Sequence, residues 1–146
     1  MDSRCESDAA RRARTQLATL TRAAIGNEEV LDARVLAGLR DYQRPGEPDF
    51  LIHLISVFLD DLSLRLESIR NAQARGDHGT LRSAAHALKG ASGELGAKRL
   101  HALCAQLEAT ARSGILAGAQ PLVREVEHEA VRVRRAMEVL RSPQTT

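Results

Sequence analysis

A single histidine stands among small residues between Ala84 and Gly96 of this 146-residue chain. In a helix, residues three and four apart share a face. The neighbours of His86 on that face are Arg82, Ser83, Lys89 and Gly90, with Gly93 one turn further. Glycine is about 1 kcal/mol less favourable than alanine inside a helix, so two glycines on one stripe need a reason. We infer that they leave the imidazole on a cleared surface beside cationic groups, an arrangement suited to chemistry at a histidine.

A histidine that carries a phosphoryl group has three physical requirements. One ring nitrogen must be unprotonated, a second protein must be able to approach, and positive charge must lie near the developing negative oxygens. His86 supplies the nitrogen, and Gly90 with Gly93 supplies the access. Lys89 and Arg82 supply the charge. This face has no glycine-rich phosphate loop and no carboxylate cluster for Mg²⁺, so any metal would have to come from a partner.

The apolar spacing predicts the helices that must position these residues. They cover residues 8–25, 33–42, 48–74, 78–94, 97–112 and 116–141. His86 lies off the apolar stripe of the 78–94 helix, so we expect its side chain to be exposed. Short loops between the four long or medium helices predict an all-α protein, an antiparallel up-and-down four-helix bundle with a short extra helix and an additional N-terminal helix. The expected organisation is a tail and accessory helix at 1–26, the bundle domain at 27–141 and a disordered tail at 142–146.

Composition supports helices and limits the partners. Three aromatic residues and no tryptophan argue against a sandwich or barrel, and a net charge of +2 does not indicate nucleic-acid binding. Cys5 lies in the polar N-terminal tail and Cys104 in an apolar stripe, which is typical of a reduced intracellular protein with one buried thiol. The longest mostly apolar run, 50–59, is about half a membrane span. We therefore expect a cytoplasmic monomer with no membrane insertion.

The stretch from Ala85 to Ser92, followed by Leu95-Gly96-Ala97 and Leu100, closely resembles the core motif of histidine-containing phosphotransfer (HPt) domains. Other parts of the chain also fall where such domains have similar residues. These parts are Leu31-Asp32, Phe58-Leu59-Asp60-Asp61, Gly76-Asp77, and Cys104 to Leu107-Glu108. The resemblance covers roughly residues 29–141.

The resemblance implies a phosphorelay intermediate that accepts a phosphoryl group on His86 from a receiver-domain aspartate and passes it to, or back to, another. Lys89 would support the phosphoryl oxygens, and Gly90 would keep the approach open. HPt domains usually supply a polar side chain, often glutamine, from the next helix. Here the matching residue is Glu108, with Gln106 two residues before, and a carboxylate would orient the ring but oppose a phosphoryl group placed too close.

The same resemblance implies a carrier and not an enzyme with its own ATP site. No cofactor or resident metal is expected, because Mg²⁺ would belong to the partner receiver domain. The implied partners are receiver domains of a hybrid sensor kinase, of a response regulator, or of both. A free-standing protein and the C-terminal part of a hybrid kinase both fit the sequence.

Other interpretations stay open at this stage. His86 and Lys89 would also suit an ordinary solvated helix surface, and Ser83 and Ser92 suit hydroxyls without a chemical role. A face with His101, Cys104 and Glu108 has metal-binding spacing, although Cys104 is better explained as a core residue. The alternative functions are a fragment of a histidine kinase and a non-catalytic helical adaptor that docks a receiver or kinase domain.

Overall fold

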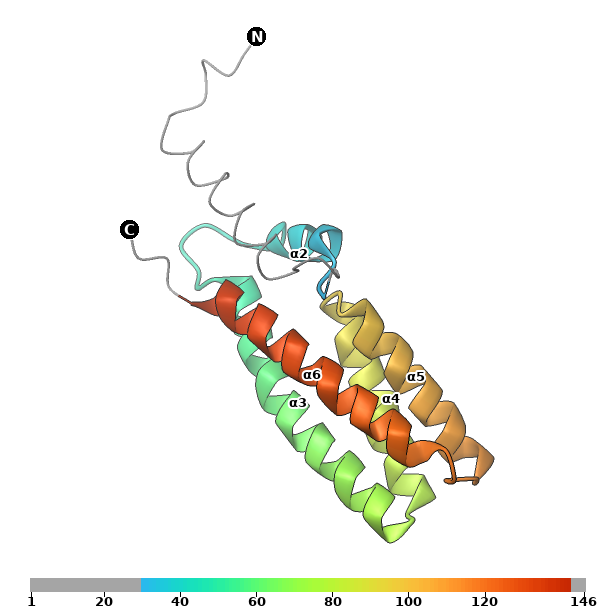
Figure 1. The fold of residues 1–146 in the computed structure, drawn as a ribbon. Coiled ribbons are helices and arrows are strands. Elements are labelled where there is room, and N and C mark those ends of the chain that lie inside the picture. The colour runs from blue at the N-terminus through green and yellow to red at the C-terminus, as the bar shows by residue number, and fades with distance from the viewer. Residues whose placement is uncertain (1–29, 143–146) are drawn as a thin grey trace.

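The computed structural model describes residues 30–142, which form five helices and, within that range, no strand. The helices are α2 (Ala33–Arg40), α3 (Phe50–Arg75), α4 (His78–Glu94), α5 (Lys98–Ser113) and α6 (Ala119–Arg141). Helices α3 to α6 run side by side as an up-and-down bundle, and the short α2 lies across one end (Figure 1). This confirms the predicted all-α bundle with its short extra helix. The helix predicted at 8–25 and the last four residues lie outside the described part of the chain.

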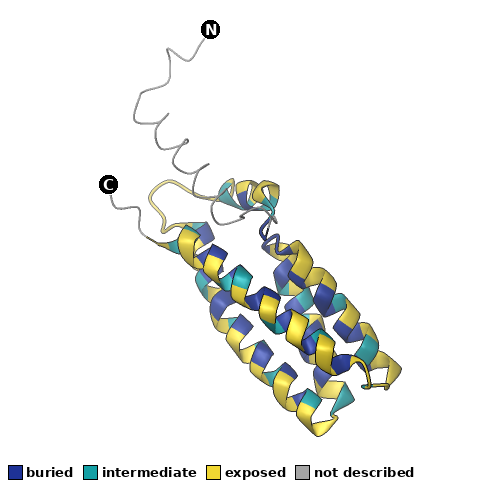
Figure 2. Ribbon diagram, in the orientation of Figure 1, coloured by how far each residue is buried: buried dark blue, intermediate teal, exposed yellow. Residues whose placement is uncertain are grey.

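Each bundle helix buries one stripe of apolar side chains against the other three helices. Figure 2 shows these buried positions facing the centre of the bundle, with exposed positions on the outside. The largest fully buried side chains are Leu31, Leu36, Ile55, Leu62, Ile69, Leu81, Leu88, Leu100, Leu107, Met137, Val126 and Val133. Helices with one apolar face pack in this way because burial of that face drives their association. Between residues 30 and 142, no helix has the length and apolar character needed to cross a membrane.

Helix α3 begins two residues later than predicted. The sequence placed its start at Pro48, whereas the first helical residue is Phe50 and Asp49 is the N-cap. The carboxylate of Asp49 accepts a hydrogen bond from the backbone N–H of Ile52 at 3.0 Å. An aspartate in this position satisfies one of the free N–H groups of the first turn, so it sets the start of the helix.

Helix α6 begins at Ala119 and not at residue 116 as predicted. The physical reason is Pro121, which is tolerated in a first turn but not deeper in a helix. A start at residue 116 would put Pro121 in the second turn, where its ring meets the carbonyl four residues earlier. Differences of one or two residues at the ends of α2, α3 and α5 are ordinary fraying of helix termini.

The turn between α4 and α5 anchors α2 to the bundle. Gly96 adopts a positive φ of 78°, and its carbonyl accepts a hydrogen bond from the backbone N–H of Asp32 at 2.8 Å. A Cβ on Gly96 would lie only 3.0 Å from the Cβ of Val35. Asp32 also caps α2 and pairs with Lys98 at 3.0 Å. This single turn thus fixes where the chain enters the bundle.

Candidate functional site

Helix α4 holds His86 on its outer side. Asp77 caps the helix, accepting hydrogen bonds from the N–H of Thr80 at 3.1 Å and from its hydroxyl at 2.7 Å. The inner side of α4 buries Leu81, Ala84, Ala85 and Leu88. His86 lies off this stripe, and its side chain is 67% exposed, as the periodicity predicted.

Glu108 of α5 lies at the centre of the site and contacts residues of both α4 and α5. Its side chain is only 6% exposed, and both of its oxygens have partners. Oε2 lies 2.9 Å from Nδ1 of His86 and 3.1 Å from Nη2 of Arg112, and Oε1 lies 2.7 Å from Nζ of Lys89. The site is therefore one carboxylate that contacts two cations and the imidazole.

The Lys89 ammonium, with a smaller contribution from His86, lowers the pKa of Glu108 from its ordinary 4.5 to about 2, although burial opposes the shift. Glu108 is therefore ionised at neutral pH and can only accept hydrogen bonds. Because it contacts Nδ1 of His86, that nitrogen must carry the ring proton. The lone pair of the neutral imidazole is then on Nε2, as nucleophilic attack by the ring requires.

The two glycines on the His86 face have different surroundings. A Cβ on Gly90 would meet no atom within 4 Å, so the surface beside His86 is open there. A Cβ on Gly93 would lie 3.0 Å from Nδ1 of His101. That nitrogen donates a hydrogen bond to the backbone carbonyl of Lys89 at 2.8 Å. Because Gly93 has no side chain, the His101 ring of α5 can pack directly against α4 at this position.

The other residues singled out from the sequence lie apart from this cluster. Arg82 and Ser83 are exposed on α4, and among residues 30–142 neither forms a hydrogen bond or ion pair with it. Ser92 is buried, and its hydroxyl has no partner within the described part of the chain. Cys104 is fully buried in the core, and the described residues contain no group of three or more ligands placed to hold a metal ion.

Sequence reasoning missed Arg112 as a contributor to the site, and it considered His101 only as a possible metal ligand. Arg112 follows Glu108 by four residues, a spacing that brings opposite charges together on a helix. His101 precedes Glu108 by seven residues, which places it on the same face of α5 two turns away. Both spacings can be read from the sequence, but they indicate a contribution to the site only once Glu108 is known to face α4.

The chain is similar to known proteins in sequence and in fold. Residues 53–141 match the family model of the Hpt domain. Histidine-containing phosphotransfer protein 5 of Arabidopsis thaliana is 35% identical over 69 residues, which span 45% of this chain and 44% of that protein. The match therefore covers less than half the length of this relative.

Solved structures of similar proteins share the fold. Histidine-containing phosphotransfer protein B (HptB) from Pseudomonas aeruginosa PAO1 is 36% identical with a TM-score of 0.73, covering 79% of this chain and 96% of that one. The histidine-containing phosphotransfer protein ZmHP2 from maize has a TM-score of 0.76 at 21% identity, covering 87% of this chain and 93% of that one. At that lower identity the likeness supports the fold alone.

Proposed function

We propose, because this chain belongs to the Hpt domain family, that it works as a phosphorelay intermediate with His86 as its phosphoacceptor. The phosphoryl group comes from an aspartate of one receiver domain and passes to, or back to, an aspartate of another. The observation that carries this proposal is the contact of 2.9 Å between Nδ1 of His86 and the buried, ionised carboxylate of Glu108. That contact leaves the lone pair of an exposed ring on Nε2.

The transfer step follows from this tautomer. The Nε2 lone pair of His86 attacks the phosphorus of the aspartyl phosphate, an N–P bond forms, and the P–O bond to the aspartate breaks to release a carboxylate. The proton stays on Nδ1, so the phosphorylated ring carries a positive charge opposite Glu108. The reverse transfer breaks the N–P bond as the next aspartate attacks. Fixed opposite charge of this kind stabilises a transfer whose catalysis depends on position and electrostatics.

The charge of Glu108 is compatible with a phosphoryl group on His86. The carboxylate contacts Nδ1, the ring nitrogen that is not phosphorylated. Lys89 and Arg112 contact its two oxygens and offset its negative charge. We assign Lys89 two roles, to hold Glu108 in place and to keep positive charge close to the phosphoryl oxygens. Gly90 leaves the surface beside the ring open to the partner.

In this proposal the chain is a carrier with no ATP site of its own. Its partners are receiver domains of a hybrid sensor kinase, a response regulator, or both, and they supply the aspartate and its Mg²⁺. Incubation with ATP alone should leave the protein unlabelled. Labelling from ATP without a kinase would favour a histidine kinase fragment instead.

The decisive experiment is phosphotransfer from a receiver domain labelled on its aspartate. The parent protein should acquire an acid-labile, base-stable phosphoryl group, and the His86→Gln variant should acquire none. His53→Gln is the matched control, because His53 is an exposed histidine of α3 outside the site. Undiminished labelling of His86→Gln would refute the assignment. A receiver that binds both proteins equally and transfers to neither would indicate the adaptor.

Two substitutions of Glu108 test its role as a positioning residue. Glu108→Gln keeps an oxygen that can accept from Nδ1, whereas Glu108→Ala removes it. We expect the glutamine variant to retain transfer and the alanine variant to be slower by about tenfold or more, because the ring loses its fixed orientation. Equal rates for the two variants would rule out orientation by Glu108 and would leave the assignment of His86 intact.

A further inference from the structure

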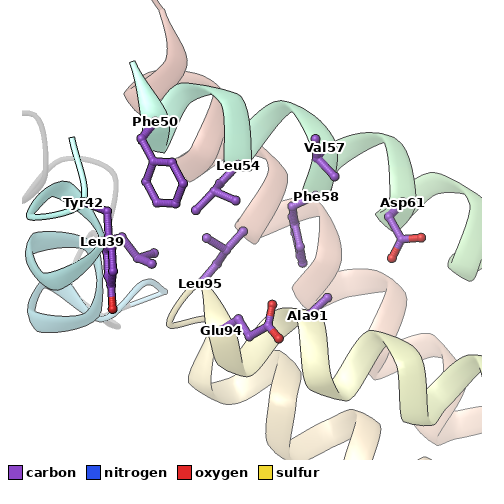
Figure 3. A pocket seen from close by; sticks show the side chains of 10 residues that line it. All are labelled: Leu39, Tyr42, Phe50, Leu54, Val57, Phe58, Asp61, Ala91, Glu94 and Leu95. Atoms are coloured by element: carbon purple, nitrogen blue, oxygen red, sulfur yellow. The ribbon is translucent and has the colours of Figure 1, made fainter. Parts of the chain in front are cut away.

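Helix α4 presents different surfaces to its two neighbours, α3 and α5. On the α3 side, Ala91 lines an apolar pocket together with residues of α2 and α3 (Figure 3). On the α5 side, Gly93 lies against the ring of His101, whose Nδ1 is 3.0 Å from the place that a Cβ would take. In a helix of 3.6 residues per turn, positions 91 and 93 are about 160° apart. The pocket and His101 therefore lie on different sides of α4.

His101 and Glu108 contact α4 at two successive levels of the same helix pair. Helices α4 and α5 run in opposite directions (Figure 1). Seven residues separate His86 from Gly93 on α4, and seven separate His101 from Glu108 on α5. Seven residues are about two turns, so both pairs can meet along one line. The ring of His101 packs on Gly93 at one level, and Glu108 contacts His86 at the other.

Lys89 lies between these two levels and is bonded to both. Its Nζ pairs with Oε1 of Glu108 at 2.7 Å, and its backbone carbonyl accepts a hydrogen bond from Nδ1 of His101 at 2.8 Å. A carbonyl oxygen can only accept, so Nδ1 of His101 carries a proton. One residue of α5 thus fixes the side chain of Lys89, and another fixes its backbone.

The backbone of α4 needs such support next to Lys89, because glycines occupy positions 90 and 93. Glycine is less favourable than alanine inside a helix, since its backbone loses more conformational freedom. Gly90 leaves the surface beside His86 open, whereas the ring of His101 fills the space above Gly93. The hydrogen bond from His101 attaches this stretch to α5, in addition to the bonds that α4 forms with itself.

We propose that His101 is a positioning residue for phosphoryl transfer at His86, a role that rests on the proposed function. By bonding to the carbonyl of Lys89, His101 fixes how far α5 slides along α4. That register keeps Glu108 within reach of Nδ1 of His86. A misplacement of about 1 Å can slow a reaction that depends on orientation by about a hundredfold, so a bond that sets the register affects the rate.

Two substitutions of His101 test this role through the rate of transfer from a labelled receiver domain. His101→Ala removes the bond to the Lys89 carbonyl, and we expect transfer to His86 to be slower by about threefold or more. His101→Asn keeps an N–H donor in the place of Nδ1, because both nitrogens are attached to Cγ, and should transfer at close to the parent rate. His128→Asn is the matched control, since His128 is an exposed histidine of α6.

The tautomer of His86 gives a second measurement that needs no partner protein. Nitrogen-15 NMR distinguishes a protonated ring nitrogen from an unprotonated one, and the contact with Glu108 predicts the proton of the neutral ring on Nδ1. In His101→Ala we expect a larger share of rings with the proton on Nε2, because Glu108 is no longer held against Nδ1. His101→Asn and His128→Asn should keep the parent tautomer.

A double-mutant cycle separates action through Glu108 from a general loss of stability. If His101 acts by holding Glu108 in place, His101→Ala should slow transfer in the parent but not in Glu108→Ala. Circular dichroism of each variant verifies that the bundle is folded. Slowing of the same size in both backgrounds would overturn the proposal, because His101 would then affect transfer independently of Glu108.

Failure of this inference can be told apart from failure of the proposed function. A parent protein that accepts no phosphoryl group would refute the function, and the tautomer of His86 would still show whether His101 positions the ring. If the parent accepts the group while His101→Ala keeps both the parent rate and the parent tautomer, the inference is wrong and the assignment of His86 stands. Equal slowing by His101→Ala and His101→Asn would also overturn it, because the hydrogen bond would then not be the cause.

Discussion

The ammonium of Lys89 lies 2.7 Å from Oε1 of Glu108, in an ion pair that ties α4 to α5 beside His86. The lysine side chain is 28% exposed and the glutamate side chain 6%, so the pair is shielded from water on the carboxylate side. Removing one partner of such a pair leaves a buried charge uncompensated. Lys89 is therefore part of the structure of the site, in addition to the role in phosphoryl transfer that we propose for it.

The lowered pKa of Glu108 predicts an acid-dependent loss of stability. The carboxyl group of Glu108 has a pKa of about 2 in the folded protein, against an ordinary value of 4.5. Its ionised form therefore stabilises the fold fully when the pH is above 4.5. That contribution is lost as the pH falls towards the lower value. Urea unfolding from about pH 5 to about pH 2 should therefore show a steeper loss of stability in the parent than in Glu108→Gln. Glu94→Gln, at an exposed position of α4, is the control. Its free energy of unfolding should change with pH as steeply as that of the parent.

The close approach of His101 to Gly93 predicts coupling between these two positions. Replacing Gly93 by alanine improves helix propensity by about 1 kcal/mol, but the new Cβ displaces the ring that bonds to the Lys89 carbonyl. Gly93→Ala should therefore stabilise the protein by about 1 kcal/mol only in the His101→Ala background. Gly90→Ala, with nothing near the new Cβ, should stabilise both backgrounds equally. Equal effects of Gly93→Ala in the two backgrounds would contradict the coupling.

Gly96 should tolerate substitution less well than Gly114, although both have a left-handed backbone. Their φ angles are 78° and 76°, and alanine in that region costs about 1–2 kcal/mol at either position. At Gly96 the new Cβ also meets Val35 and Asp32 at 3.0–3.1 Å, whereas at Gly114 the nearest atom is 3.8 Å away. Urea unfolding should show the larger loss of stability for Gly96→Ala. Equal losses of stability in the two variants would mean that α2 shifts to accommodate the methyl group with no loss of free energy.

The thiol of Cys104 should be unreactive in the folded protein. Burial raises its pKa to about 12, so very little thiolate is present at neutral pH, and no part of the residue is accessible. In a Cys5→Ser background, a thiol reagent such as a disulfide dye should react with Cys104 only after urea is added. Reaction as fast without urea as with it would show that α5 opens readily to solvent.

Much of the fold followed from local patterns. Apolar residues three and four apart identified the four long helices, and Asp77 and Gly76 marked the boundary between α3 and α4 correctly. The starts of α3 and α6 were wrong because Asp49 and Pro121 act through local backbone bonding that the apolar pattern does not contain. Phe50 and Leu54 share the apolar spacing of α3, yet they line a pocket, since periodicity indicates a face and not what covers it.

The spacing of His86, Lys89 and Gly90 along the chain is enough to place them on one face of a helix, because the pitch of a helix is fixed. Resemblance to a family then pointed to Glu108 without showing what it contacts. The packing of α5 against α4 brings Glu108 into contact with both His86 and Lys89, with Arg112 beside them, and lays His101 over Gly93. The spacing of residues along the chain does not reveal these contacts. Contacts between helices depend on how far one helix slides and rotates against the next, and the packing of the whole core sets that register.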